Sequence, residues 1–270
     1  MWNVLTAVVL VAIALLYAVG AVRLRKTRAL RNWQVAAFFV GCLSAAGALL
    51  SRLDVWSDIL FSAHMTQHEI LMLVTAPLMV LGRPFIATLW AWPRRARKHL
   101  GTLTRALSKP WEAITGALTV LILHAVVLWV WHVPALFESA LHNEAIHVFQ
   151  HLGFFLTAAL FWWALIHGRY GRLGYGVGVV YVFATAMHTQ ILGALLTFGS
   201  RTLYPTHAHR TAASGGSALQ DQQLAGIVMW IPFGAVFVLI GLALFAAWLG
   251  EAERRVAFTT AETATRESRA

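Results

Sequence analysis

The chain has 270 residues, of which 59% are hydrophobic and 12% are charged, and it carries a net charge of +10. Ordinary soluble domains contain about 25% charged residues, so this composition excludes a soluble globular domain and predicts an integral membrane protein. The basic residues follow individual apolar runs instead of forming one patch, which argues against binding to nucleic acid.

Seven apolar runs are long enough to cross a bilayer as helices, because about 20 residues span its hydrocarbon core. Their hydrophobicity is continuous and not alternating, which excludes the strands of a membrane barrel. The predicted spans are residues 2–22, 32–51, 60–81, 111–131, 145–166, 174–198 and 223–249. The sequence therefore predicts an all-α, polytopic bundle of seven transmembrane helices in a single domain, 1–250, with a disordered cytoplasmic tail, 251–270.

The lysine and arginine residues predict the orientation of this bundle. All but three of the 21 follow the first, third, fifth or last span, and the exceptions are Arg52, Arg201 and Arg210. Because cytoplasmic loops carry the excess of basic residues, we expect the N-terminus outside and the C-terminus in the cytoplasm. The basic cluster after residue 22 also indicates that the first run is a retained span and not a cleaved secretory signal.

Two connections between the spans have distinctive compositions. Residues 82–110 combine Trp90 and Trp92 with clustered arginine and lysine, which predicts a helix lying along the inner headgroups. The outside loop 199–222 contains His207, His209 and a Ser-Gly-Gly-Ser run, and we expect it to be mobile. The single cysteine, Cys42, falls inside the second span and is expected to be a small core residue.

A short histidine motif occurs twice. Residues 64–68 read H-M-T-Q-H and residues 147–151 read H-V-F-Q-H, and each copy opens a span predicted to run from outside to inside. Residues four apart share one face of a helix. Each pair of histidines can therefore direct two imidazoles toward one point, and the repetition at one depth favours a functional role.

Ten of the 12 histidines fall on the predicted outer side, with His99 and His167 on the inner side. A polar side chain in hydrocarbon is costly unless it finds a partner, and imidazole is the commonest metal ligand in proteins. Hydrogen bonding between helices explains a single histidine, whereas the whole set predicts a metal or cofactor site. Counting depth from the helix ends places His68, His124, His151 and His188 in one layer. With His64 and His147, which share helix faces with His68 and His151, they are the six predicted metal ligands: His64, His68, His124, His147, His151 and His188.

The choice of metal and the role of neighbouring groups stay open in the sequence. The thioethers of Met65 and Met187 adjoin predicted ligands and would suit Cu(I), while zinc and haem iron are alternatives. Three glutamines are candidates for a hydrogen bond to the second nitrogen of a ligating imidazole: Gln67, Gln150 and Gln190. Asp221 is expected to cap the last span, and Glu69 to form a salt pair or an interior hydrogen bond.

Six stretches resemble a known family. They are HMTQHEILMLVTAPLMVLGRP (64–84), WHVPALFESAL (131–141), HVFQHLGFFLTAALFWW (147–163), MHTQILGALLTF (187–198), LYP (203–205) and DQQLAGIVMWIP (221–232). In this order they are similar to the seven-helix CtaG family of cytochrome c oxidase assembly factors. The departures are small: Glu69 stands where the family is usually apolar, and Phe233-Gly234 stands where a glycine pair is common.

This resemblance implies a non-enzymatic protein of the plasma (inner) membrane that helps to mature a haem-copper oxidase. Its implied partners are the oxidase subunits, and its implied cargo is copper, handled on the outer side. Three other functions remain open at this point. An intramembrane zinc hydrolase would use Asp221 or Glu69 as general base. A haem-b electron carrier would clamp iron between imidazoles, and a structural scaffold would use its histidines to hydrogen-bond one another.

Overall fold

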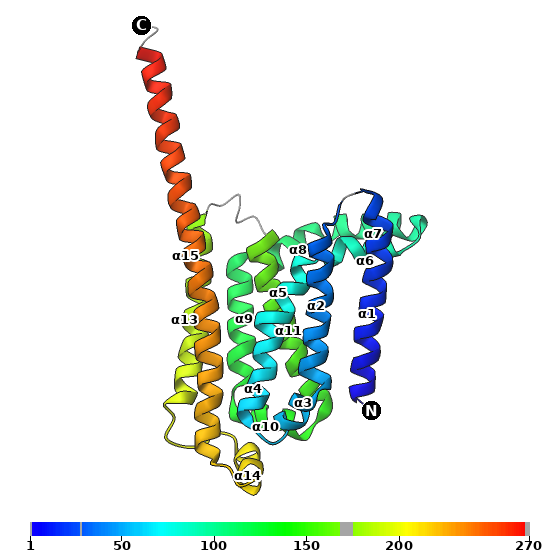
Figure 1. The fold of residues 1–270 in the computed structure, drawn as a ribbon, viewed down its shortest axis with the longest axis vertical. Helices are drawn as coiled ribbons and strands as arrows, with labels where there is room; N and C mark the ends of the chain where they lie inside the picture. Colours follow the sequence, from blue (N-terminus) through cyan, green and yellow to red (C-terminus); the bar gives the residue numbers. More distant parts are fainter. Residues whose placement is uncertain (1, 28, 168–174, 268–270) are drawn as a thin grey trace.

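The computed structural model describes residues 2–27, 29–167 and 175–267. Within these residues the fold is helical and contains no strand, which confirms the predicted all-α class. Figure 1 shows long helices side by side in a bundle, with short helices lying across both of its ends.

The helices follow one another along the chain with short connections. They are α1 (Trp2–Leu24), α2 (Asn32–Leu50), α3 (Arg52–Ser57), α4 (Phe61–Glu69), α5 (Ala76–Leu81), α6 (Pro84–Ala91), α7 (Arg94–Ala106), α8 (Ser108–Ile114), α9 (Ala117–Trp131), α10 (Pro134–His142), α11 (Glu144–His167), α13 (Tyr175–Thr197), α14 (Pro205–Ala213) and α15 (Ala218–Glu267). A 3-10 turn, η1 (Arg25–Thr27), follows α1, and a π-helical segment, η2 (Ile70–Thr75), joins α4 to α5.

Five helices are individually long and apolar enough to cross a membrane: α1, α2, α11, α13 and α15. Two bent pairs raise the number to seven if each pair is one span, namely Phe61–Leu81 with Pro84–Ala91, bent by 57°, and Ser108–Ile114 with Ala117–Trp131, bent by 58°. The first bend follows from sequence, because Arg83 adopts a left-handed conformation with φ 52° and Pro84 cannot continue a preceding helix. The predicted seven spans are therefore the upper limit of the observed range.

The two ends of the bundle differ in what covers them. One end carries the N-terminus with α3, α10 and α14, and the other carries α6, α7 and α8 (Figure 1); we call them the α10 end and the α7 end. Three helices thus replace the single interfacial helix expected over 82–110. Among them α7 holds no buried residue, and its basic side chains stand on the face opposite Leu100, Leu103 and Leu107.

The basic residues are distributed between these ends as the sequence suggests. Arg23 lies at the α7 end and donates hydrogen bonds to the carbonyls of Trp90 and Ala91. The three exceptional arginines begin α3, follow α13 and lie in α14, all at the α10 end. Arg169 and Arg172, which also entered the orientation argument, lie outside the described residues. The placement of the α10 end outside the cell stays a prediction.

The largest core cluster joins α4, η2, α5, α9, α11, α13 and α15 through buried aromatic, methionine and aliphatic side chains. A smaller cluster joins α1, α2 and α6, where the ring of Tyr17 stacks on Phe38 at 3.7 Å and the Tyr17 hydroxyl donates to the Gly82 carbonyl at 2.8 Å. Cys42 belongs to this second cluster and is buried, as predicted.

Glycine allows a close helix crossing between α13 and α15. A Cβ atom on Gly226 of α15 would lie 2.4 Å from Thr197 Oγ1 and 2.5 Å from the Thr197 backbone nitrogen, both on α13. Any side chain would push the helices apart, so Gly226 sets their spacing. This spacing matters because α13 and α15 close the bundle around α4, α9 and α11.

The π-helical segment η2 connects the first part of the third predicted span, α4, to its last part, α5. A π turn shifts the hydrogen-bond register and leaves backbone groups available to other partners. Trp162 on α11 uses one of them, donating from Nε1 to the Met72 carbonyl at 2.9 Å, and its side chain is buried. This contact fastens α11 to the third span one turn beyond the histidine motif.

The last helix extends beyond the rest of the bundle at the α7 end (Figure 1). It runs through Glu267, so the described part of the tail, 251–267, is helical where the sequence analysis expects disorder. The tail is rich in alanine, glutamate and arginine, which are good helix formers. An ion pair between Arg255 and Glu251, one turn apart at 2.5 Å, supports the same conformation.

Candidate metal centre

The two copies of the histidine motif meet at the α10 end of the bundle. α4 supplies His64 and His68, and α11 supplies His147 and His151, at the start of spans that run in the same direction. Within each helix the two rings lie 4.4 and 4.3 Å apart, measured between centroids. Between helices the His64 and His147 rings are 5.2 Å apart, and the His68 and His151 rings 4.9 Å. We call these four residues the histidine cluster.

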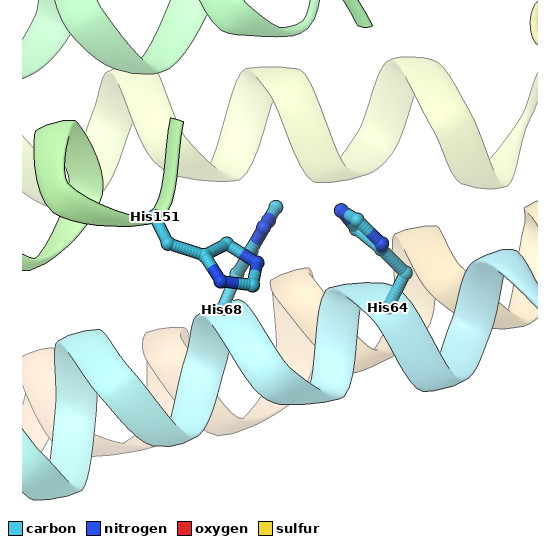
Figure 2. A group of neighbouring side chains, drawn as sticks. All are labelled: His64, His68 and His151. Atoms are coloured by element: carbon cyan, nitrogen blue, oxygen red, sulfur yellow. The ribbon is translucent and has the colours of Figure 1, made fainter. Parts of the chain in front are cut away.

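Three of these side chains offer ligand atoms to a common point. One ring nitrogen each from His64, His68 and His151 lies within 4.8 Å of the other two. Figure 2 shows the three rings facing one another across the space between α4 and α11. Nitrogen atoms around one tetrahedral metal are roughly 3.3 Å apart, given metal–nitrogen bonds of about 2.0–2.1 Å. Small side-chain rotations therefore suffice to close the cluster on an ion.

The cluster is buried and its hydrogen-bonding capacity is unused. His64 and His68 are each 1% exposed. Buried nitrogens on all four rings, including both on His68, have no hydrogen-bond partner within the described part of the chain. A buried polar atom without a partner costs about 1–3 kcal/mol. Since these rings do not bond to one another either, the arrangement fits a metal site better than a scaffold of hydrogen-bonded histidines.

His132 and His207, which the set of six does not include, lie next to the histidine cluster. His132 Nδ1 is 2.7 Å from the Leu128 carbonyl, which can only accept, so Nδ1 carries the proton and Nε2 keeps its lone pair. The rings of His68 and His132 both lie against Phe154, at 4.6 and 5.7 Å. His132 belongs to the W-H-V-P stretch, but only the folded chain brings that stretch beside the cluster.

His207 reaches the cluster from a segment that the sequence predicts to be mobile. It lies in α14, is 2% exposed, and its ring is 5.6 Å from that of His64. Burial lowers the pKa of His207 to about 4, so the imidazole is neutral at pH 7 and its lone pair is free for a ligand. The neighbouring His209 is exposed.

Polar contacts hold α14 over the side of the cluster that faces the α10 end of the bundle. The Glu138 carboxylate accepts from the backbone nitrogen of Thr206 at 3.2 Å and from its hydroxyl. The Tyr204 hydroxyl donates to the His132 carbonyl at 2.9 Å, and the Thr211 hydroxyl to the Ile59 carbonyl at 3.0 Å. These bonds join α14 to α10, to the end of α9 and to the start of α4. The segment is therefore an ordered cap in the structure.

Asp221 positions α4 from a distant part of the chain. It lies in the first turn of α15, yet its carboxylate accepts from the backbone nitrogens of Phe61 and Ser62, at 2.7 and 3.3 Å, and from the Ser62 hydroxyl at 2.5 Å. Free N–H groups at a helix start need such acceptors. The aspartate thus caps α4 and not its own helix, which disagrees with the expected role. These bonds occupy one of the two carboxylates, Asp221 and Glu69, that the zinc hydrolase hypothesis offers as general base.

The three glutamines differ from their expected role beside the imidazoles. Gln67 donates to the Ala48 carbonyl at 2.8 Å and to Asp54 at 3.1 Å, because it lies on the face of α4 toward α2 and α3. Gln190 donates to the Trp230 carbonyl at 3.1 Å. Gln150 is fully buried, and neither atom of its amide has a partner among the described residues.

The two methionines differ in burial. Met65 is buried in the largest core cluster, whereas Met187 is 45% exposed. Glu69 is buried, and its Oε2 atom has no hydrogen-bond partner within the described ranges, in contrast to the expected interior hydrogen bond.

The remaining two predicted ligands form a separate pair. His124 on α9 and His188 on α13 have ring centroids 5.7 Å apart, and His124 Nδ1 lies 3.0 Å from Thr157 Oγ1 on α11. Thr157 is one and a half turns beyond His151, a rise of about 9 Å along α11. Depth counted from each helix end assumes that the ends are level, and α10, between α9 and α11, offsets them. The six predicted ligands thus divide into the cluster of four and this pair.

Comparison with known proteins gives a family and distant relatives. A family model described as cytochrome c oxidase caa3 assembly factor (Caa3_CtaG) matches residues 15–251. Uncharacterized proteins of Mycobacterium bovis and Mycobacterium tuberculosis are each 26% identical over 260 residues, covering 92% of this chain and 39% of theirs. One from Mycobacterium leprae is 25% identical over 254 residues, covering 88% and 38%. The chain therefore spans less than half the length of these relatives. No solved structure matches it.

Proposed function

This chain belongs to the cytochrome c oxidase caa3 assembly factor family, and from that premise we propose that it holds copper at the histidine cluster and delivers it during oxidase maturation. In this proposal it is a non-enzymatic protein of the plasma membrane, with seven spans and the α10 end outside. Copper is its cargo, and the oxidase subunits are its partners.

The observation that carries the proposal is the convergence of four buried imidazoles from two helices. His64, His68 and His151 offer three nitrogens within 4.8 Å of one another, and His147 adjoins them. The unpartnered nitrogens on these rings supply the donor set that copper accepts. In a bundle interior, a bound ion satisfies several of these atoms at once, which explains why the cost of burying them is tolerated.

The surroundings of the cluster favour uptake of a cation from the α10 end. Three acidic residues, Asp54, Asp58 and Glu144, are near enough to act electrostatically on His147. Carboxylates at the mouth of a site concentrate cations there. Neutral imidazoles farther in carry no positive charge that would repel a cation drawn to this end of the site. Transfer then proceeds by exchange of one imidazole for the next, since four rings lie within 6 Å of a neighbour.

The packing of the rings favours a bare ion over a haem. A haem held by two imidazoles needs a slot between them for the flat macrocycle, whereas five of the six ring pairs in the cluster have centroids only 4.3 to 5.9 Å apart. The engagement of Asp221 in capping α4 gives no support to the hydrolase hypothesis.

The test is copper content measured on purified protein. The chain is loaded with Cu(I) under anaerobic conditions in competition with a chromophoric chelator, and copper per chain is determined by elemental analysis. We expect His64→Ala/His68→Ala/His151→Ala to lose one copper equivalent. The matched control is His209→Ala, which removes an exposed histidine from the same end and keeps the wild-type content.

The same variants are then assayed for cytochrome c oxidase activity in membranes of a host that depends on this protein. The triple variant is expected to lower the activity, and His209→Ala to leave it unchanged. If the triple variant bound as much copper as the wild type, the proposed copper site would be wrong whatever the oxidase activity.

A further inference from the structure

The pair formed by His124 and His188 has the features of a site of its own. His124 is 2% exposed, and its contacts in the described ranges are with Thr157, with the ring of Phe161 at 6.4 Å and with the ring of His188 at 5.7 Å. His188 is half-buried, but both of its ring nitrogens are buried and lack a hydrogen-bond partner in the part of the chain that the structure describes. Hydrogen bonding within the described chain therefore does not explain why the His188 ring nitrogens are buried.

Thr157 fixes the tautomer of His124. The Thr157 hydroxyl has the Gly153 carbonyl as an acceptor within its own helix at 2.8 Å, and with its single hydrogen engaged there its oxygen accepts from His124 Nδ1 at 3.0 Å. Nδ1 therefore carries the proton, and Nε2 presents a lone pair. This is the arrangement that orients a histidine for metal binding, in which the second nitrogen is held by a hydrogen bond.

The separation of the two rings suits one ion between them. With metal–nitrogen bonds of about 2.0–2.1 Å, two imidazoles that share an ion have ring centroids roughly 5 Å apart at a tetrahedral angle and roughly 6.4 Å apart when the two bonds are collinear. The observed 5.7 Å lies in this range and corresponds to an open angle. Among the residues described, no carboxylate, thiol or third histidine lies close enough to form a three-ligand group with the pair.

We propose that His124 and His188 form a second copper site, which binds one Cu(I) ion through two imidazoles about 9 Å deeper in the bundle than the histidine cluster. The proposal rests on the proposed function for its cargo, but on different residues for its ligands. The chain would then bind two copper ions, one at the histidine cluster and one between His124 and His188.

Charge and coordination number select the monovalent ion. The electrostatic cost of burying an ion grows with the square of its charge, so a divalent ion costs about four times as much as Cu(I) where no anion compensates it. Cu(I) is also stable with two nearly linear ligands, whereas zinc prefers four. Two neutral imidazoles thus complete the shell of Cu(I) and leave zinc incompletely coordinated.

The first experiment counts Cu(I) on each variant by anaerobic titration against a chromophoric chelator. We expect two equivalents for the wild type and one for His188→Ala, with His124→Ala behaving alike. Zinc binding is expected to be the same in His188→Ala and wild type, because zinc is held at the cluster alone. Thr157→Val keeps both imidazoles but removes the hydrogen bond that holds the His124 tautomer. We therefore expect two equivalents of Cu(I), with the second bound about 10-fold to 100-fold more weakly than in the wild type.

A second measurement examines the pair by itself. In His64→Ala/His68→Ala/His151→Ala, the single remaining Cu(I) should give the X-ray near-edge absorption of a two-coordinate ion with nitrogen ligands. His188 is partly exposed, so His188→Ala and Thr157→Val carry the test if His124→Ala does not fold.

The outcomes separate this proposal from the proposed function. Unchanged copper content in His188→Ala, or a three- or four-coordinate spectrum in the triple variant, would overturn the second site. If His188→Ala loses one equivalent while the triple variant loses none, the second site stands and the cluster fails as a copper site. Loss of one equivalent from each supports both.

Discussion

Some residues near the cluster are candidate metal ligands, and others hold those ligands in position. The histidine cluster contains candidate ligands, whereas the Asp221 carboxylate, within the described residues, accepts hydrogen bonds from the backbone and hydroxyl groups at the start of α4 and from one threonine of α14. His64 follows Phe61 by about one helical turn, so the aspartate that holds the start of α4 also sets the position of the first imidazole. We regard it as a positioning residue and not as a ligand.

Replacing Asp221 tests this assignment. Loss of a helix cap costs about 0.5–2 kcal/mol, so Asp221→Ala is expected to lower the unfolding midpoint in detergent and to weaken copper binding at the cluster without changing the number of ions bound. Asp221→Asn, which keeps one carbonyl acceptor, should fall between alanine and wild type. A full loss of one copper equivalent in Asp221→Asn would contradict a purely positioning role and indicate that the carboxylate is a ligand.

The residues also show where sequence reasoning succeeds. The spacing of His64 with His68 and of His147 with His151 is local, so one helix rule places each pair on one face. His132 lies against α11 and Asp221 against α4 through contacts between residues far apart in the chain, and no local pattern in a single sequence contains that information. The depth estimate for His124 failed to separate it from the cluster because it ignored the offset between helices.

At the scale of helices, α14 is the element that covers the cluster. Its contact with Glu138 on α10 holds the segment that carries His207. Glu138→Ala removes these bonds, and we expect faster hydrogen exchange of the α14 backbone and faster release of Cu(I) from the cluster. Gln220→Ala, which removes an exposed and uncharged side chain at the same end, is the control. Equal release rates in the two variants would show that α14 does not limit access.

The crossing of α13 and α15 offers a matched pair of substitutions on one helix. Gly226→Ala places a methyl group 2.4 to 2.7 Å from atoms of α13, whereas Gly241→Ala on the same helix meets nothing within 4 Å. We expect Gly226→Ala to lower the unfolding midpoint, since overpacking costs about 1–3 kcal/mol. Gly241→Ala should leave it unchanged or raise it slightly, because alanine favours a helix over glycine by up to about 1 kcal/mol. Equal midpoints would contradict the close crossing.

The sequence predicts which segments are helical better than it predicts where each helix begins, ends or bends. The third predicted span, 60–81, is present as α4, η2 and α5, but its π-helical segment has no signature in the hydrophobic pattern. The fourth, 111–131, is divided by the break between α8 and α9, where Gly116 adopts an extended conformation. Composition identifies apolar helices reliably, while bends depend on how neighbouring helices pack.

For the whole molecule, the main expectation is the orientation of the two ends in the membrane. Cys42 is the single cysteine, so a Cys42→Ala background allows one reporter at a time. We expect a membrane-impermeant maleimide to label Ala145→Cys, at the α10 end, in intact cells. Thr104→Cys in α7 should react only after the membrane is permeabilised. Both positions are exposed, so the reverse pattern would invert the proposed orientation and place the cluster at the cytoplasmic side.

The central claim for the whole molecule is that imidazoles from α4 and α11 hold one copper ion in common. X-ray absorption at the copper edge of His124→Ala/His188→Ala, which retains only the histidine cluster, tests it most directly. We expect one copper per chain with three or four nitrogen neighbours at about 2.0 Å and the multiple scattering of imidazole rings. A sample that binds no copper, or whose copper lacks imidazole scattering, would contradict the account.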